Sequence, residues 1–428
     1  MILLAMLAGL VALIAINVPI AVALGIVAVV AMVTTQGTAI LPNVALVMYD
    51  GATSFPLLAI PMFILAGAIM NATGISRRLI AFASALLGFV RGGLAIVNIG
   101  ASMFFAEISG SAVADVAATG SIMIPAMKRR GYPKAFAAAV TSSSATLAVI
   151  IPPSIPMILY AVMSNSSVVQ LFVAGIIPGI LGGLGMMGIS YWMAIRQGWP
   201  IEEVFDLCRL WVTFKDAVWA LILPVIILGG IFGGFVTATE GGGLAVAAAI
   251  LIGGVVYREL DLRYLKSSII DGGLQTAVVM LLVAASALIG VYLTELQVPQ
   301  KIASGILGIT DNKYAVLAIL NVFFLIIGLF LHSAAAIILV VPIVMPLINT
   351  VGIDPVHFGL VVTLNLGIGQ QTPPVASVLI TACSIAKANI WEVSKVNVYF
   401  VAVLFAVLML VTYLPDVPLS LVRLFYGG

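Results

Sequence analysis

The chain has 428 residues, of which 63% are hydrophobic and only 8% are charged. Soluble domains carry about 45–50% apolar and about 25% charged residues, so this composition excludes a soluble protein and indicates a polytopic membrane protein. The 18 Lys and Arg residues against 16 Asp and Glu give a net charge of +2. Because so small a net charge creates no strong field around the protein, we expect no nucleic-acid partner.

Several enzyme classes lack their usual signatures in this sequence. Cys208 and Cys383 lie far apart and match no metal-ligand spacing, so we expect neither a disulfide framework nor a zinc site. No phosphate-binding G-x-x-x-x-G-K-[ST] motif and no H-E-x-x-H motif occurs. Since no nucleophile and base stand together either, we expect that the protein is not an enzyme. The apolar start lacks the basic segment of a cleaved signal peptide, so we expect it to remain as structure.

Apolar segments long enough to cross a membrane, about 20 residues, recur along the chain. The predicted spans in chain order are 2–16 with 18–35, 55–73, 135–163, 171–195, 217–236, 241–257, 273–294, 356–385 and 394–422. Two other segments, 93–130 and 314–348, each hold two shorter apolar stretches that flank a polar break. A run of ~16 helical residues reaches only about 24 Å, so we predict two re-entrant helical hairpins whose tips lie near the membrane midplane.

Each predicted hairpin is followed by a span that a double proline interrupts, Pro152-Pro153 in one case and Pro373-Pro374 in the other. Proline removes a backbone donor and clashes with the preceding turn, so each helix must open there. The landmarks recur at one spacing: Pro152 and Pro373, Pro125 and Pro346, and Gly131 and Gly352 are each 221 positions apart. This constant offset predicts an internal duplication.

Each half contains five spans and one hairpin, and an odd number of crossings turns the second copy upside down. We therefore predict an all-α fold of two inverted repeats: 1–196 with hairpin 93–130 and broken helix 135–163, then a cytoplasmic linker, 197–216, then 217–428 with hairpin 314–348 and broken helix 356–385. If the basic linker 128–134 is cytoplasmic, alternation leaves only Lys301, Lys313 and Arg423 of the 18 Lys and Arg residues outside. The positive-inside bias supports this orientation, which places both termini in the periplasm.

Three shorter segments complete the predicted organisation. The linker 197–216 is the longest polar stretch and is expected to contain an amphipathic helix. The runs 75–90 and 299–309 lie at matched places before the two hairpins. They are predicted to be interfacial helices that act either as levers or as connectors.

Unwound backbone is tolerated inside a bilayer only where protein or a water-filled cavity satisfies it. Two hairpin tips and two opened helices at one depth are therefore the expected walls of a single midplane site. Helix N-termini at the tips favour an anion. Free carbonyls near the breaks and the hydroxyls of Ser109, Ser111, Ser333 and Thr372 are hard oxygen ligands that suit a desolvated Na⁺, and each hydroxyl could alternatively cap a helix end.

Ionisable residues inside the membrane are costly and are functional candidates by default. Asp115 follows the first tip, where it either contacts substrate or caps the helix, and Glu107 precedes it. His332 lies at the second tip, where it either binds a substrate carboxylate or is a satisfied interior histidine.

These motifs together resemble a known family, the large membrane subunits of tripartite ATP-independent periplasmic (TRAP) transporters. The resemblance covers essentially the whole chain, and its most specific segments are 109–115, 150–156, 352–359 and 369–374. It implies an elevator-type, sodium-coupled importer of small organic acids in the bacterial inner membrane, working with a small membrane subunit and a periplasmic binding protein. By this resemblance the Na⁺ ligands would be Ser109, Ile151 and Pro153 in one half, and Gly369 and Thr372 in the other.

The same resemblance places substrate contacts on Ser111 and on the second tip, His332-Ser333. Many relatives have a sequence similar to Met-Asp at that second tip, so this chain departs from the pattern there. The departure leaves open whether the substrate is sialic acid, another sugar acid or a C4-dicarboxylate.

Two other functions are compatible with the predicted fold. A stand-alone ion-coupled carboxylate carrier would need no binding protein. A channel or structural subunit would use the hairpins as a filter, and its flux would not saturate. The matched breaks favour the TRAP importer over both.

Overall fold

The computed structural model describes residues 2–16, 18–109, 111–199, 205–373 and 375–427, and these residues form helices without any β-strand. The elements of the first half are α1 (Ile2–Ala15), α2 (Ile20–Gln36), η1 (Thr38–Ile40), α3 (Leu41–Ala52), η2 (Phe55–Leu58), α4 (Ala59–Ala72), α5 (Ile75–Leu87), α6 (Gly93–Ser109), α7 (Ala112–Arg129), α8 (Lys134–Ala145), η3 (Thr146–Val149), α9 (Ile155–Ser164) and α10 (Val168–Gln197). Those of the second half are α11 (Leu207–Phe232), α12 (Ala238–Leu251), the π-helix η4 (Ile252–Val256), α13 (Leu262–Glu295), α14 (Val298–Leu307), α15 (Lys313–Phe330), α16 (Ser333–Val351), α17 (Pro355–Gly369), α18 (Ser377–Ala386), α19 (Ile390–Tyr413) and α20 (Asp416–Tyr426).

Eight helical segments of the described chain are long and apolar enough to cross a membrane. They are Phe55–Ala72, Val168–Gln197, Leu207–Phe232, Ala238–Val256, Leu265–Glu295, Lys313–Phe330, Ser333–Val351 and Ile390–Tyr413. The all-α membrane fold predicted from the sequence is therefore confirmed. At the predicted linker 197–216, α10 extends to Gln197, and α11 begins at Leu207 and continues into a span. Asp206 starts α11 by accepting a hydrogen bond from the Cys208 amide at 2.9 Å.

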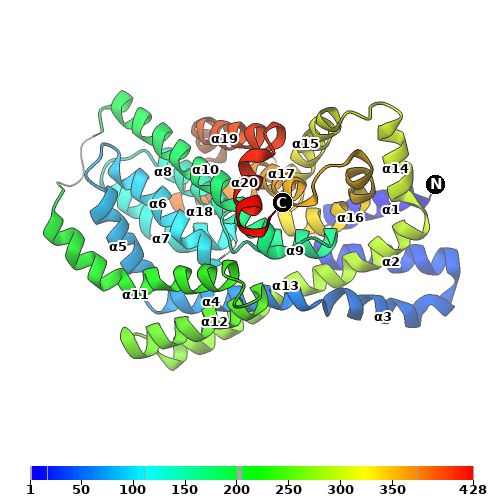
Figure 1. Cartoon of the computed structure of the whole chain (residues 1–428), viewed down its shortest axis with the longest axis horizontal. Coiled ribbons are helices and arrows are strands. Elements are labelled where there is room, and N and C mark those ends of the chain that lie inside the picture. The colour runs from blue at the N-terminus through cyan, green and yellow to red at the C-terminus, as the bar shows by residue number, and fades with distance from the viewer. Residues whose placement is uncertain (1, 17, 110, 200–204, 374, 428) are drawn as a thin grey trace.

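The helices form two groups (Figure 1). The frame consists of α1–α4 and α11–α13, in which the long α13 packs against α2, α3 and α4. The inner bundle consists of α6–α9 and α15–α18, and α10 and α19 cover one side of it. Within the bundle, α16 packs against α9 and α18 packs against α7, so elements from the two halves of the chain alternate.

The two interrupted helices are the centre of the inner bundle. All residues of 136–161 and of 356–371 are buried. Local capping fixes where each begins: Asp354 accepts hydrogen bonds from the amides of Val356 and His357 at 2.7 and 3.0 Å at the start of α17. Ser154 restarts the first helix after its break by accepting from the Met157 amide at 3.4 Å.

Two helical pairs, α6–α7 and α15–α16, correspond to the predicted hairpins. The breaks come where they were predicted, since α6 ends at Ser109, α7 begins at Ala112, α15 ends at Phe330 and α16 begins at Ser333. Each arm has 17 to 19 residues, or about 26–29 Å, which is longer than the expected half-membrane stretch. The re-entrant form of the two hairpins stays a prediction.

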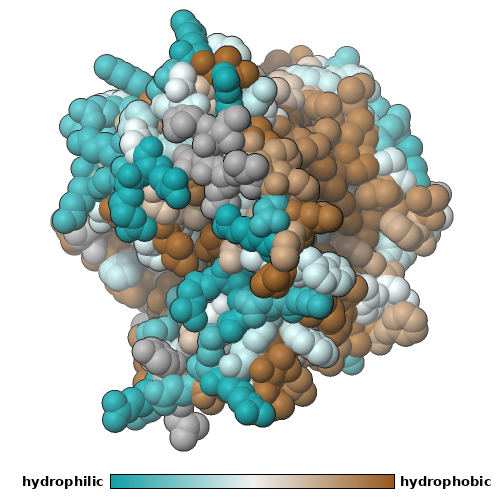
Figure 2. Space-filling view, turned by 90° about the vertical axis from the view of Figure 1, so that its left-hand side faces the viewer, coloured by the Kyte–Doolittle hydropathy of each residue, from teal (hydrophilic) through white to brown (hydrophobic). Residues whose placement is uncertain are grey.

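Helix α5 connects the frame to the first hairpin, and ion pairs hold it against the frame. Arg78 contacts Glu259 at 2.9 Å and Asp216 at 3.2 Å, and its guanidinium lies 3.9 Å from the centre of the Tyr257 ring. The hydrogen bond from Arg78 lowers the pKa of the Glu259 carboxyl and raises that of the guanidinium. Figure 2 faces this end of the molecule, where hydrophilic residues gather beside a hydrophobic face.

Helix α14 has the corresponding place before the second hairpin, between α13 and α15. It packs against α13 and α16. Gln297 precedes it in the left-handed conformation, and Lys301 donates a hydrogen bond to the Leu296 carbonyl at 2.9 Å. The helix between frame and hairpin is thus held by ion pairs in the first half. In the second half, Lys301 instead hydrogen bonds a nearby main-chain carbonyl.

Candidate functional site

A cavity of about 760 Å³ lies where the two hairpin tips, the two helix breaks and the frame meet. The first tip lines it with Ser111–Ala114 and the second with His332–Ala335. Since the bodies of the hairpins lie on opposite sides of this region (Figure 1), the two tips point toward each other. The two tips and the two breaks were predicted from the sequence to share one site, and the structure brings them together.

The helix breaks and the frame close the remaining walls. Val149 and Ile155 come from the first break, and Gln370 comes from the second. Gln275 and apolar residues of α2, α4 and α13 form the wall on the frame side. The cavity therefore lies between the inner bundle and the frame.

Four helices begin at this cavity, namely α2, α7, α9 and α16. The amides of a helix's first turn have no partners within the helix and carry a partial positive charge, which favours an anion. His332 is the one ionisable side chain among the described lining residues, so the polar lining is otherwise uncharged: Ser111, Gln275, Ser333 and Gln370. The arrangement suits a small anion with further groups that hydrogen bond.

The second break is tied to the first half of the chain by the buried side chain of Gln371. Its amide nitrogen donates to the Ser142 carbonyl at 2.8 Å and to the Thr146 hydroxyl, and its amide oxygen accepts from the Ser142 hydroxyl at 2.6 Å. Asn397 of α19 donates to the Gln371 carbonyl at 3.2 Å and accepts from Ser143 at 2.5 Å. One amide thus joins α8, α17 and α19 directly behind the cavity.

The last turn of α17 approaches the end of α15 without a side chain between them. A Cβ atom on Gly369 would clash with the backbone of Gly328. Glycine at both positions allows the helix ends of the second hairpin and the second break to touch. This close approach brings the carbonyl ends of two helices together beside Gln370.

The structure places the predicted substrate residues in different surroundings. Ser111, His332 and Ser333 line the cavity. Asp115 lies in the first turn of α7 and is fully buried, but it is not among the residues that line the cavity. Its carbonyl accepts a hydrogen bond from the Thr119 hydroxyl at 2.6 Å.

The predicted Na⁺ ligands lie next to the two breaks. Ile151 and Pro153 are buried in the turn between η3 and α9. Gly369 is the last residue of α17, and the half-buried Thr372 donates its hydroxyl to the Ile368 carbonyl at 3.1 Å. Ser109 ends α6, and its side chain lies outside the described part of the structure. No group of three or more His, Cys, Asp and Glu residues that could hold a metal ion occurs among the described residues.

Sequence reasoning missed two parts of this site. Gln275 is the one amide of α13 that faces the cavity, and its signal was a single glutamine in a long apolar helix. The partners of Gln371 in the first half of the chain come from the hydroxyl-rich run 141–146, which is unusually polar for a predicted span. That run could have been recognised as a buried hydrogen-bonding segment, but its partner could not.

Comparison with known proteins decides the family. Residues 7–417 match the model described as tripartite ATP-independent periplasmic transporter, DctM component. The chain belongs to this family. The resemblance found in the sequence is thereby confirmed, and the chain is a multi-pass membrane protein of a transport system.

Individual family members differ in what their names say they transport. The chain is 43% identical over 408 residues to the isethionate TRAP transporter permease protein DctMQ of Oleidesulfovibrio alaskensis. The alignment covers 94% of this chain and 64% of that protein. It is 38% identical over 379 residues to the C4-dicarboxylate TRAP transporter large permease protein DctM of Pseudomonas aeruginosa, covering 89% of each. It is 37% identical over 380 residues to the sialic acid TRAP transporter large permease protein SiaM of Vibrio cholerae, again covering 89% of each.

A solved structure shares the fold. The YdaH transporter of Alcanivorax borkumensis aligns with a TM-score of 0.65 at 13% sequence identity, and the alignment covers 90% of this chain and 91% of that one. At this identity the likeness concerns the fold alone.

Proposed function

We propose that the protein is the large membrane subunit of a TRAP transporter that imports a small organic acid together with Na⁺ across the bacterial inner membrane. The observation that carries this proposal is the cavity enclosed by two hairpin tips and two helix breaks in a member of the DctM family. Helix starts around an otherwise uncharged cavity favour an anionic substrate. Relatives named for isethionate, a C4-dicarboxylate and sialic acid are consistent with that class.

Na⁺ would bind at the two breaks, and Na⁺ is the coupling ion of the proposed mechanism. Ile151 and Pro153 supply carbonyl oxygens at the first break, together with Ser109 of the first tip. Gly369 and Thr372 supply oxygens at the second break, where the Thr372 hydroxyl donates its proton to Ile368 and keeps lone pairs for a cation. Ligand sets of neutral oxygens suit a desolvated alkali ion.

Each of the two inverted repeats, 1–196 and 217–428, would contribute helices to a fixed part, the frame, and to a moving part, the inner bundle. The inner bundle would carry substrate and Na⁺ past the frame in an elevator movement, with α5 and α14 as the connections. Asp115 would support the first tip from beneath, and His332 and Ser333 would contact the substrate. Both termini would lie in the periplasm.

The proposed partners are a small membrane subunit and a periplasmic substrate-binding protein. The family's description names its members as one component of a tripartite transporter, and this supports the proposal that the chain works with further components. A stand-alone carrier of organic acids is the competing function, and it would need neither partner.

Uptake into proteoliposomes tests the proposal. The chain, with its small subunit, would be reconstituted with and without a Na⁺ gradient and with and without the binding protein, and offered isethionate, C4-dicarboxylates, sialic acid and 2,3-diketo-L-gulonate. Saturable uptake that needs both Na⁺ and the binding protein is the expected result. Uptake by this chain alone would support the stand-alone carrier, and uptake that persists without Na⁺ would refute the coupling ion.

A further inference from the structure

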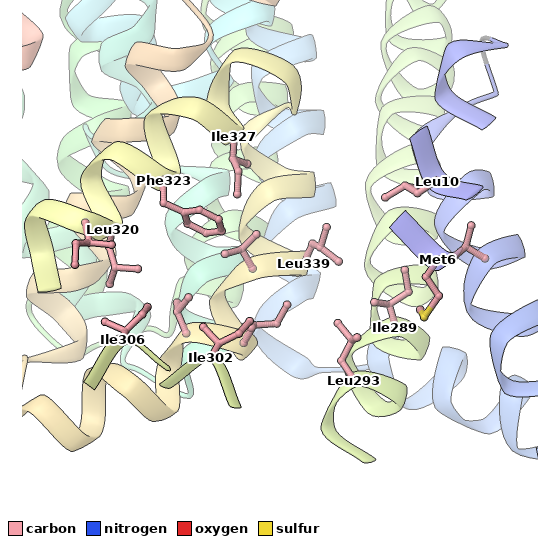
Figure 3. A pocket seen from close by; sticks show the side chains of 15 residues that line it. Met6, Leu10, Ile289, Leu293, Ile302, Ile306, Leu320, Phe323, Ile327 and Leu339 are labelled. Atoms are coloured by element: carbon pink, nitrogen blue, oxygen red, sulfur yellow. The ribbon is translucent and has the colours of Figure 1, made fainter. Parts of the chain in front are cut away.

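A second cavity lies on the far side of the second hairpin, between the hairpin and the frame. It has a volume of about 440 Å³ and is lined by 15 residues of α1, α2, α13, α14, α15 and α16. Every lining side chain is apolar. Figure 3 shows Met6 and Leu10 of α1 on one side of an open space and Phe323 and Leu339 on the other. We call this space the hairpin-2 groove.

The chemistry of the hairpin-2 groove excludes the transported anion and water as its normal contents. Neither finds a hydrogen-bond partner there, and cavities without polar groups stay dry. The lining residues of α13, α15 and α16 belong to three of the segments that are long and apolar enough to cross a membrane. At that depth the surrounding medium is lipid hydrocarbon.

The size of the groove matches one hydrocarbon chain. A cavity of about 150 Å³ holds benzene, so 440 Å³ holds on the order of 18 carbon atoms, which is the length of one lipid acyl chain. A helix of a partner subunit is too wide, because two turns of a helix about 10 Å in diameter already occupy roughly 850 Å³. The groove is also open to the bilayer, since Ile302, Ile319 and Phe323 are 38 to 42% exposed.

A positive charge lies on α14, the helix that lines the groove with Ile302 and Ile306. Lys301 is exposed on α14, next in sequence to the lining residue Ile302, and uses one of its three donors on the Leu296 carbonyl. The remaining donors can bind the phosphate of a lipid headgroup. Neither α14 nor the frame offers a carboxylate to Lys301 among the ion pairs of the described residues.

We propose that the hairpin-2 groove binds one acyl chain of a membrane phospholipid, whose phosphate pairs with Lys301. The chain fills the space between α1 and α13 of the frame and α15 and α16 of the hairpin. In the first half, α5 is held to α11 by the Arg78 to Asp216 pair and by Phe82 and Phe214, whose ring centres are 5.8 Å apart, and these two rings line a separate apolar pocket of about 670 Å³. A fluid chain lets the second hairpin shift against the frame without opening a void.

A photoactivatable phospholipid with a diazirine at the end of an acyl chain tests the groove directly. The full chain, reconstituted in vesicles of phosphatidylethanolamine and phosphatidylglycerol that contain this probe, would be illuminated and digested, and adducts would be located by mass spectrometry. We expect adducts on Phe323, Leu339 and Ile343. Leu339→Trp, which fills the groove, should lower their yield about tenfold, and Lys301→Gln should lower it less.

The matched control is Val322→Trp, because Val322 is 59% exposed on α15 and does not line the groove. It should leave the groove adducts unchanged. Leu10→Trp fills the groove from the frame side and guards against misfolding of Leu339→Trp, and the melting temperature of each variant is measured alongside. The proposal would be overturned if adducts were spread evenly over the groove and the outer face of the helices. It would also be overturned if neither Leu339→Trp nor Leu10→Trp lowered the yield of adducts in the groove. Cross-links from groove residues to a co-reconstituted small subunit would also overturn it. The readout does not involve transport, so its failure is distinguishable from failure of the proposed function.

Discussion

The two hairpin-bearing halves of the protein follow one plan and are held by different chemistry. In the first half, α5 is fixed to the frame by the ion pairs of Arg78. In the second half, α14 borders an apolar groove, and the polar contacts concentrate at the inner break, where Gln371 reaches into α8 and α19. The comparison indicates that the first half is anchored at its outer edge and the second half at its centre.

Removing the central anchor should have the largest effect. Gln371→Ala removes the side-chain partner of the buried Ser142 hydroxyl and takes one hydrogen bond each from Thr146 and Asn397, and each buried polar group left unsatisfied costs about 1–3 kcal/mol. We expect a large loss of thermal stability, measured by unfolding in detergent, and loss of uptake. Gln300→Ala, at an exposed position of α14, is the control and should behave like wild type. A Gln371→Ala protein as stable as the control would show that the amide does not join the halves.

Thr372→Ala tests the same break for its proposed ion. Loss of one oxygen ligand should raise the Na⁺ concentration for half-maximal uptake about tenfold, while the substrate KM at saturating Na⁺ changes little. Among the described residues, the Thr372 hydroxyl donates only to the carbonyl of Ile368, four residues earlier in the chain. Because this bond is local, we expect the variant to keep the fold. An unchanged Na⁺ dependence would remove Thr372 from the site.

The two tips provide a third contrast, because the second tip lines the cavity with an imidazole and a hydroxyl, whereas Ser111 is the one polar side chain among the described lining residues of the first. His332→Ala and Ser333→Ala should each raise the substrate KM roughly fivefold through a lost hydrogen bond. His332→Ala should in addition change the ratio of kcat/KM between substrates that differ in their acidic group. Ser304→Ala, on the exposed face of α14, is the matched control. Equal ratios in wild type and His332→Ala would mean that the histidine does not contribute to substrate selection.

Arg78→Gln removes the outer anchor of the first half. Arg78 is 17% exposed at its side chain and makes two ion pairs, whereas Arg77 is 70% exposed and makes one at 3.3 Å. We expect Arg78→Gln to lower stability by about 1–2 kcal/mol and to slow uptake, and Arg77→Gln to do neither measurably. Similar behaviour of the two variants would indicate that α5 is held by packing instead.

Lowering the pH should weaken the ion pair between Arg78 and Glu259, with a smaller effect on stability than Arg78→Gln. The pKa of Glu259 is lowered from its ordinary value of 4.5, chiefly by the hydrogen bond from Arg78. A lowered pKa in the folded state means that the ion pair contributes fully above pH 4.5 and that its contribution is lost as the pH falls through the folded value. The difference in melting temperature between wild type and Glu259→Gln should therefore shrink on acidification below pH 4.5. A difference independent of pH would contradict the ion pair.

The sequence predicted the positions of all four interruptions, because a polar break or a double proline in an apolar run is a local signal. Helices end at Ser109, Val149, Phe330 and Gly369, next to the predicted tips and breaks. The contacts that hold the halves could not be predicted. Gln371 and Ser142 are 229 residues apart, and Arg78 and Glu259 are 181 apart. Single-sequence periodicity shows which face of a helix is apolar but not which distant polar group it meets.

Gln275 shows a further limit. A lone amide in a long apolar helix could face lipid, another helix or a cavity, and the residues around it in the sequence are apolar in all three cases. Its place opposite the tips follows from the packing of α13 against α16. The frame's contribution to the site therefore comes from tertiary structure.

The central claim is that the two tips share one substrate cavity, and protection of cysteines from labelling tests it most directly. In a background of Cys208→Ser and Cys383→Ala, Ala117→Cys and Ala334→Cys introduce thiols at the cavity wall beside the first and the second tip. Ser304→Cys on α14 is the control. We predict that a transported organic acid slows labelling at both cavity positions, only when Na⁺ is present, and leaves Ser304→Cys unaffected. Protection at one tip alone, or at neither, would contradict a shared site.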